Sequence, residues 1–89
     1  MNESYLEITF RHGRAIAAYL YLPRRAADKS VRTRLADPGL VVDLARDGRP
    51  IGVEITAPQA VTVAALNRVL RALGAPVVTR ADLAPLRAA

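Results

Sequence analysis

The sequence predicts an α+β fold, in which a five-stranded antiparallel meander sheet has one face covered by a C-terminal helix and is followed by a short extra helical turn. Three observations lead to this prediction. Five segments between residues 5 and 56 alternate apolar and polar side chains, which is the period of half-buried strands. Short links rich in Gly, Pro and Asp separate these segments. Beyond residue 59 the apolar period changes from two to that of a helix.

The first two segments, residues 5–10 and 15–22, form the first predicted hairpin. Their inward positions are Leu6, Ile8, Phe10, Ile16, Ala18, Leu20 and Leu22. Three tyrosines, Tyr5, Tyr19 and Tyr21, then point to the other face, because successive side chains of a strand alternate. Gly13 in the connection suits the positive φ that tight hairpin turns require.

A polar stretch without apolar period, residues 23–29, follows and is expected to be a mobile surface loop. The third strand, residues 30–35, points Arg32 and Arg34 outward. Its inward positions are Val31, Thr33 and Leu35. The Asp-Pro-Gly sequence of residues 37–39 then supplies strong turn chemistry, so a second hairpin follows directly.

Residues 40–56 are the best-specified stretch and read as two strands joined by a turn at residues 46–49. The inward positions are Leu40, Val42, Leu44, Ile51, Val53 and Ile55. Asp43 and Glu54 face outward on neighbouring strands, on the same predicted face as Arg32 and Arg34. We therefore expect cross-strand ion pairs that keep both carboxylates charged.

The C-terminal third is helical. Residues 62–73 carry an apolar stripe, with Thr62 as the expected N-cap and Gly74 as the residue that ends the helix. This stripe is the expected cover for the apolar face of the sheet. Residues 79–86 form a short helical turn that opens with a capping box made by Thr79 and Asp82, as Pro85 prevents a longer helix.

Length and composition bound the class of protein. The 89 residues, taken as one domain over 1–89, build a small core, so a second copy of the chain would extend that core and we expect a homodimer. The N-terminus lacks a signal peptide and no apolar run reaches the roughly 20 residues of a membrane span, which predicts a cytoplasmic protein without a membrane partner. The net charge of +5 comes from arginines spread along the whole chain.

No catalytic or metal-binding set is visible in the sequence, and no cofactor is predicted. Asp43, Asp47, Gly48 and Glu54 have the spacing of a calcium loop, but they lie in a predicted hairpin where calcium loops have flanking helices. Asp43 and Glu54 could instead work as an acid/base pair. His12 is the single histidine and is expected to be a solvated turn residue. Pro85 also argues against a helix-turn-helix over residues 62–86.

The outward tyrosines suggest an interaction surface. Tyr19 and Tyr21, with Tyr5, Ala17 and Val41 beside them, suit the centre of a protein interface, although an ordinary half-exposed strand surface has the same pattern. Flanked by Arg32 and Arg34, they would also suit base stacking in a nucleic-acid binder. The candidate interaction surface comprises Tyr19, Tyr21, Arg32, Arg34, Asp43 and Glu54.

Residues 8–56 resemble the bacterial domain-of-unknown-function family 2283. The resemblance rests on a Tyr-containing strand at residues 19–22, Pro-Gly at 38–39, Val-Asp at 42–43, Asp-Gly at 47–48 and Gly-Val-Glu-Ile at 52–55. The chain departs from the family pattern where acids often precede the tyrosine strand, and at Ala45, where the family often has an acid. The resemblance implies a compact β-rich domain and brings no established activity.

The function that the sequence favours is a non-enzymatic, homodimeric protein-interaction module. An arginine-dependent nucleic-acid binder is the alternative, because arginine suits phosphate contacts. A small acid/base enzyme that uses Asp43 and Glu54 is the third hypothesis.

Overall fold

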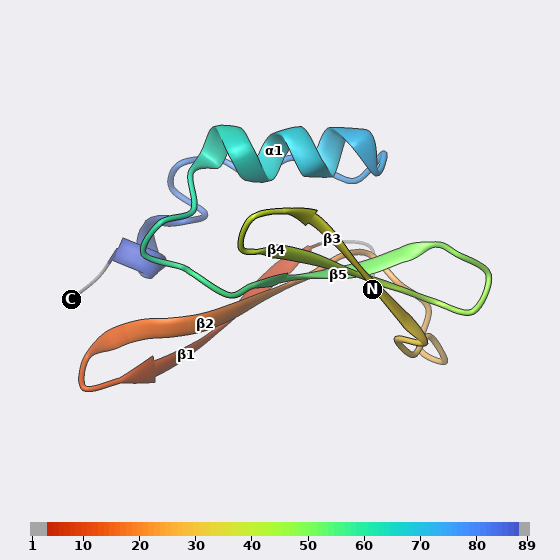
Figure 1. The fold of residues 1–89 in the computed structure, drawn as a ribbon, viewed down its shortest axis with the longest axis horizontal. Helices are drawn as coiled ribbons and strands as arrows, with labels where there is room; N and C mark the ends of the chain where they lie inside the picture. Colours follow the sequence, from red (N-terminus) through yellow and green to blue (C-terminus); the bar gives the residue numbers. More distant parts are fainter. Residues whose placement is uncertain (1–3, 88–89) are drawn as a thin grey trace.

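A computed structural model describes residues 4–87 and confirms the predicted α+β class. The strands are β1 (Tyr5–Arg11), β2 (Arg14–Tyr21), β3 (Arg32–Asp37), β4 (Leu40–Leu44) and β5 (Pro50–Ile55). The helix α1 (Val63–Ala72) and a short 3₁₀ helix, η1 (Ala84–Arg87), complete the chain. Figure 1 shows α1 lying across one face of the twisted sheet.

The five strands are antiparallel as predicted, but their order is β1-β2-β5-β4-β3, which differs from the sequential order of a simple meander. After β2 the chain crosses to the far edge of the sheet, forms β3 and then returns through β4 to β5. The strand β5 therefore lies at the centre, between β2 and β4. Its apolar residues Ile51, Val53 and Ile55 are almost fully buried, which suits a central strand better than an edge.

The face beneath α1 holds the hydrophobic core. Leu20 pairs with Val53, and Val53 with Val42, so residues of three strands line up on this face. Leu66 and Leu70 of α1 pack against them and are fully buried. The predicted caps of α1 are confirmed: the Thr62 hydroxyl oxygen accepts a bond from the Ala65 N–H at 3.0 Å, and Gly74 has a φ of 69°.

The prediction that Ile16 and Phe10 point into the core is wrong. A bulge pairs Thr9 with Ala17 and Phe10 with Ala15, which leaves Ile16 as an extra residue in β2. Ala15 is consequently buried, whereas Ile16 is 46% exposed. Phe10 is also exposed, because the end of the β1–β2 hairpin extends beyond α1 (Figure 1).

The prediction for the two faces of β3 is also wrong. Arg34 pairs with Val42, so Arg34 and its neighbour two residues back, Arg32, lie on the α1 side of the sheet. Leu35 pairs with Val41 on the other face and is 69% exposed. β3 is an edge strand, and Thr33 and Leu35 lie on its face away from α1, so these side chains stay outside the core. All three predicted inward positions, Val31, Thr33 and Leu35, are exposed.

The C-terminal segment is anchored by polar contacts. The predicted capping box is confirmed, since the Thr79 N–H donates to Asp82 Oδ2 at 2.8 Å and the Asp82 N–H to Thr79 Oγ1 at 3.1 Å. Asn67, buried on α1, donates to the Val78 carbonyl at 2.9 Å and accepts from the Val78 N–H at 2.8 Å. This pair of bonds holds the extended link that follows α1 against the helix.

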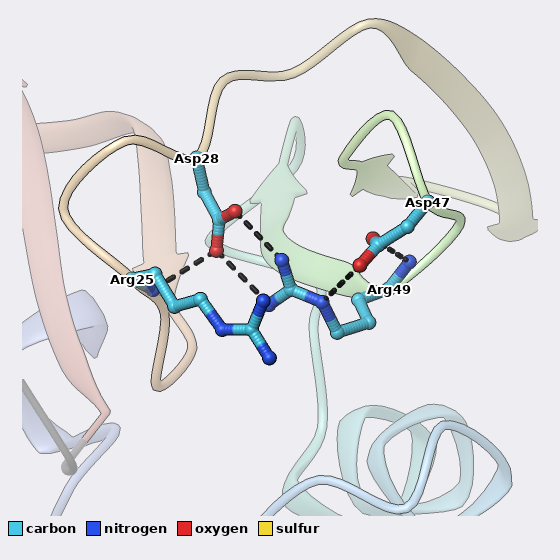
Figure 2. Close-up of polar contacts among 4 residues, drawn as sticks. All are labelled: Arg25, Asp28, Asp47 and Arg49. Atoms are coloured by element: carbon cyan, nitrogen blue, oxygen red, sulfur yellow. Dashed lines mark hydrogen bonds and ion pairs between the residues drawn. The ribbon is translucent and has the colours of Figure 1, made fainter.

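The connection between β2 and β3 is tied to the β4–β5 turn by Arg49, as Figure 2 shows. Arg49 donates two bonds to the Asp28 carboxylate, at 2.7 and 3.0 Å, and one to Asp47 at 2.6 Å. The Arg25 N–H donates a further bond to Asp28 at 2.9 Å. Hydrogen bonds from Arg49 are the main cause that lowers the pKa of Asp28 and of Asp47.

Within residues 4–87, no helix has both the length and the apolar character needed to cross a membrane.

Candidate functional site

The sheet face opposite α1, called the open face below, carries the candidate site. No helix of the described chain covers it (Figure 1). Strand register places every member, because directly paired residues point to the same side of a sheet. Its members are Tyr5, Glu7, Thr9, Ala17, Tyr19, Tyr21, Thr33, Leu35, Val41, Asp43, Gly52 and Glu54.

The three tyrosines form one cluster on the open face. The rings of Tyr5 and Tyr21 stack with centroids 4.4 Å apart and an interplanar angle of 14°. Tyr19 meets Tyr21 edge to face at 4.6 Å. The guanidinium of Arg24, from the loop after β2, lies 5.2 Å from the centre of the Tyr21 ring. The cluster is a semi-rigid aromatic surface, since each ring is held by another.

Tyr19 lies across the neighbouring strand, directly over Gly52. Any Cβ at position 52 would overlap the hydroxyl and the ring of Tyr19. Only glycine therefore leaves room for the ring at this point of β5. In this position the Tyr19 hydroxyl donates a 2.7 Å hydrogen bond to Asp43 Oδ2 on β4. The burial of Tyr19 and this bond to Asp43 both raise the pKa of the Tyr19 hydroxyl.

Asp43 and Glu54 form a carboxyl pair beside Tyr19. Asp43 is only 7% exposed, although carboxylates are rarely buried without a partner. The pKa of Glu54 is raised, first by its hydrogen bond with Asp43, then by burial and by the charge of Asp43. The pair can therefore hold a proton that a solvated glutamate would release.

Arg24 closes one side of this cluster. It donates to the carbonyl oxygen of Ile51 at 2.6 Å and to the Tyr19 hydroxyl at 3.3 Å. The loop after β2, which was predicted to be mobile, thus contributes a cation to the open face. The bonds hold Arg24 against β5 and the tyrosine cluster.

A shallow hollow of about 310 Å³ lies on the other side of Tyr19. Glu7 and Glu54 contribute carboxyl groups to its wall, and Thr9 lines it as well. The Tyr21 hydroxyl donates to Glu7 Oε1 at 3.1 Å, and this bond raises the pKa of Tyr21. Two carboxyl groups beside an aromatic ring are the groups that bind ammonium and guanidinium cations.

The structure brings together four of the six predicted interaction residues, Tyr19, Tyr21, Asp43 and Glu54. It places Arg32 and Arg34 on the opposite side of the sheet, so the predicted ion pairs with the carboxylates are wrong. Throughout residues 4–87, the ion pairs join Arg49 to Asp28 and Asp47 instead.

Sequence reasoning missed Glu7, Arg24 and Gly52 as members of the site. Glu7 already alternates with Tyr5 on the first strand, and a glycine within a strand often marks a close approach, so two of the three had a usable signal. Arg24 had none, because its contacts depend on the path of a loop.

The arrangement can stack planar groups, attract cations and exchange a proton. In the described part of the chain, no group of three or more His, Cys, Asp or Glu side chains could hold a metal ion. The residues that match the calcium-loop spacing are a hairpin: Asp47 accepts bonds from Arg49, and Gly48 takes a φ of 88° in the turn.

Comparison with curated proteins and with solved structures gave no match. A family model described as "Protein of unknown function (DUF2283)" matches residues 17–57. The match spans β3, β4, β5 and most of β2, and thus includes Tyr19, Arg24, Asp43, Gly52 and Glu54. The DUF2283 family thus matches the segment that builds the centre of the sheet and most of the open face.

Proposed function

We propose that the protein is a non-enzymatic interaction module whose open face binds a protein partner that presents cationic side chains. The observation that carries this proposal is the tyrosine cluster, which lies beside carboxyl groups on a sheet face that no described helix covers. Tyrosine is enriched in protein interfaces, since its ring gives a large contact area at little entropic cost.

The charge of the open face supports a cationic partner. Glu7, Asp43 and Glu54 all lie there, although the chain as a whole has a net charge of +5. Arginine or lysine side chains of a partner could enter the hollow between Glu7 and Glu54 and lie against Tyr19. Complementary charge of this kind favours the correct partner and increases the association rate.

A second copy of the chain is a less suitable occupant of the same surface. A two-fold pairing of open faces would bring the same three carboxyl groups of each copy together, and like charges in an interface cost binding energy. We therefore propose that the homodimer expected from the small size of the chain forms through another surface. Sedimentation velocity on the wild type and on Thr9→Arg tests this, because both should show the same mass.

The main test compares two matched variants. Thr9→Arg adds one positive charge to the open face, and Ala64→Arg adds the same charge to the exposed side of α1. A partner is captured from the native host with the wild-type protein, identified by mass spectrometry, purified and titrated against all three proteins. We expect Thr9→Arg to weaken binding at least tenfold and Ala64→Arg to change it less than twofold. Equal effects of the two variants would refute the proposal.

The two other hypotheses gain unequal support. The raised pKa of Glu54 favours acid/base chemistry as a second candidate, and turnover that disappears in a folded Glu54→Gln variant would establish it. Nucleic-acid binding loses the support of Arg32 and Arg34, since both lie on the other side of the sheet, and keeps only that of Arg24 beside the Tyr21 ring. Binding of single-stranded DNA at low salt that weakens in Tyr21→Ala would restore it.

A further inference from the structure

The hydrogen bonds of Asp43 are incomplete. Its Oδ2 accepts the 2.7 Å bond from the Tyr19 hydroxyl. Its Oδ1 is buried, and none of the described residues donates a hydrogen bond to it as long as the nearby carboxyl groups are ionised and so cannot donate. A buried acceptor without a donor costs about 1 to 3 kcal/mol, and more when it carries a charge, so proteins rarely leave one unpaired.

The groups around this oxygen identify the missing donor. The Tyr19 hydroxyl is already committed to Oδ2, and Arg24 donates to Tyr19 and Ile51. Glu7 lies on β1, which β2 and β5 separate from the strand of Asp43, and it accepts the bond from Tyr21 there. Thr33, which pairs with Asp43 from β3, and the buried Nε of Arg24 donate no bond to this oxygen. Glu54, on the strand next to Asp43, is the neighbour that remains, and a hydrogen bond with Asp43 is the main cause that raises the pKa of its carboxyl group.

We infer that Glu54 carries a proton and donates it to Oδ1 of Asp43, so that the two carboxyl groups together bear one negative charge that becomes two when the proton is lost. The bond is of the charge-assisted type between a carboxylic acid and a carboxylate. It satisfies the buried oxygen and avoids two adjacent negative charges, as in other carboxyl pairs that share a site.

This proton regulates the surface assigned to partner binding, and that consequence rests on the proposed function. Loss of the proton makes the open face more negative and so favours a cationic partner. By linkage, docking of a cation beside Glu54 must in turn favour release of the proton. Affinity for such a partner should then increase as the pH rises through the titration of Glu54.

The proton can be observed without any partner. In uniformly ¹³C-labelled wild-type protein, the side-chain carboxyl signal of Glu54 is followed by NMR from acid to neutral pH. We expect its midpoint to lie above that of glutamate in an unfolded peptide. In Asp43→Asn, which removes the charged acceptor, the Glu54 midpoint should fall toward the peptide value.

A second variant keeps the inference testable if Asp43→Asn does not fold. Glu54→Gln replaces the proposed O–H donor with an N–H donor, so it should be more stable than the wild type at neutral pH and lose that advantage in acid. A wild-type Glu54 midpoint equal to the peptide value would overturn the inference, as would a Glu54→Gln variant less stable than the wild type at neutral pH. A confirmed midpoint together with equal partner binding by Thr9→Arg and Ala64→Arg would refute only the proposed function.

Discussion

Replacing Gly52 by alanine should destabilise the fold, contrary to the usual effect in a strand. A Cβ at this position overlaps the ring of Tyr19, so the tyrosine must leave its place. Its bond to Asp43 is then lost, and a hydrogen bond to a charged group contributes about 1.5 to 3 kcal/mol. The edge-to-face contact with Tyr21 adds about 0.5 to 1.5 kcal/mol. Alanine loses less backbone entropy on folding than glycine, and this offsets about 0.5 to 1 kcal/mol of the cost.

The expected net loss from Gly52→Ala is therefore about 2 kcal/mol, which is a large fraction of the stability of a chain of this size. A double-mutant cycle isolates the cause. In a Tyr19→Ala background the ring is absent, so Gly52→Ala should be neutral or stabilising by about 0.5 to 1 kcal/mol. The two substitutions thus couple by roughly 3 kcal/mol, which is far above the error of such cycles.

Urea unfolding followed by circular dichroism measures all four proteins of the cycle. With a slope of about 1 kcal/mol per molar urea, a 2 kcal/mol loss lowers the midpoint by about 2 M. The slope itself should stay constant, because the surface exposed on unfolding hardly changes. An equal cost of Gly52→Ala with and without the Tyr19 ring would refute the reasoning that Tyr19 requires this glycine.

Two further changes probe the polar contacts that hold the chain together. Asn67→Leu should lower the free energy of unfolding by about 2 to 4 kcal/mol, since it leaves the buried N–H and carbonyl of Val78 unpaired. Hydrogen-exchange measurements should show faster exchange of the Val78 amide. Unchanged exchange would contradict this role of Asn67. Arg49→Ala should lower stability at neutral pH and have no effect in acid. The lowered pKa of Asp28 and Asp47 contributes stability that is present above their unfolded values and is lost as pH falls through their folded values. Urea unfolding across a pH series tests this, and a difference that persists in strong acid would count against it.

Local features were predictable from the sequence. Thr62 and Gly74 bound α1 as expected, and the Thr79–Asp82 box forms, because caps depend on residues only a few positions apart. The turn at Gly13 follows for the same reason, with a φ of 78°. Each of these features is decided by bonds that the segment makes with itself.

Features that depend on contacts distant in sequence were not predictable. Alternation along β3 is clear, but the strand alone does not say which of its faces meets the core, and Arg34 proves to share the face of Val42. The bulge at Ile16 arises from how β1 and β2 pair. The sequence correctly places Asp43 and Glu54 on neighbouring strands. The ion pairs predicted with Arg32 and Arg34 do not form, because the arginines lie on the other face. Each wrong prediction thus concerns how two strands pair or which face of a strand meets the core, and only the assembled sheet determines these.

The position of β5 has a consequence for how the chain folds. The last strand in sequence is the central one, and it joins β2, made more than 30 residues earlier, to the β3–β4 hairpin. Until β5 has left the ribosome, the two earlier hairpins have no strand through which to meet. We therefore expect the sheet to assemble late during synthesis and relatively slowly for its size, since contacts between distant segments carry the entropic cost of closing a long loop first.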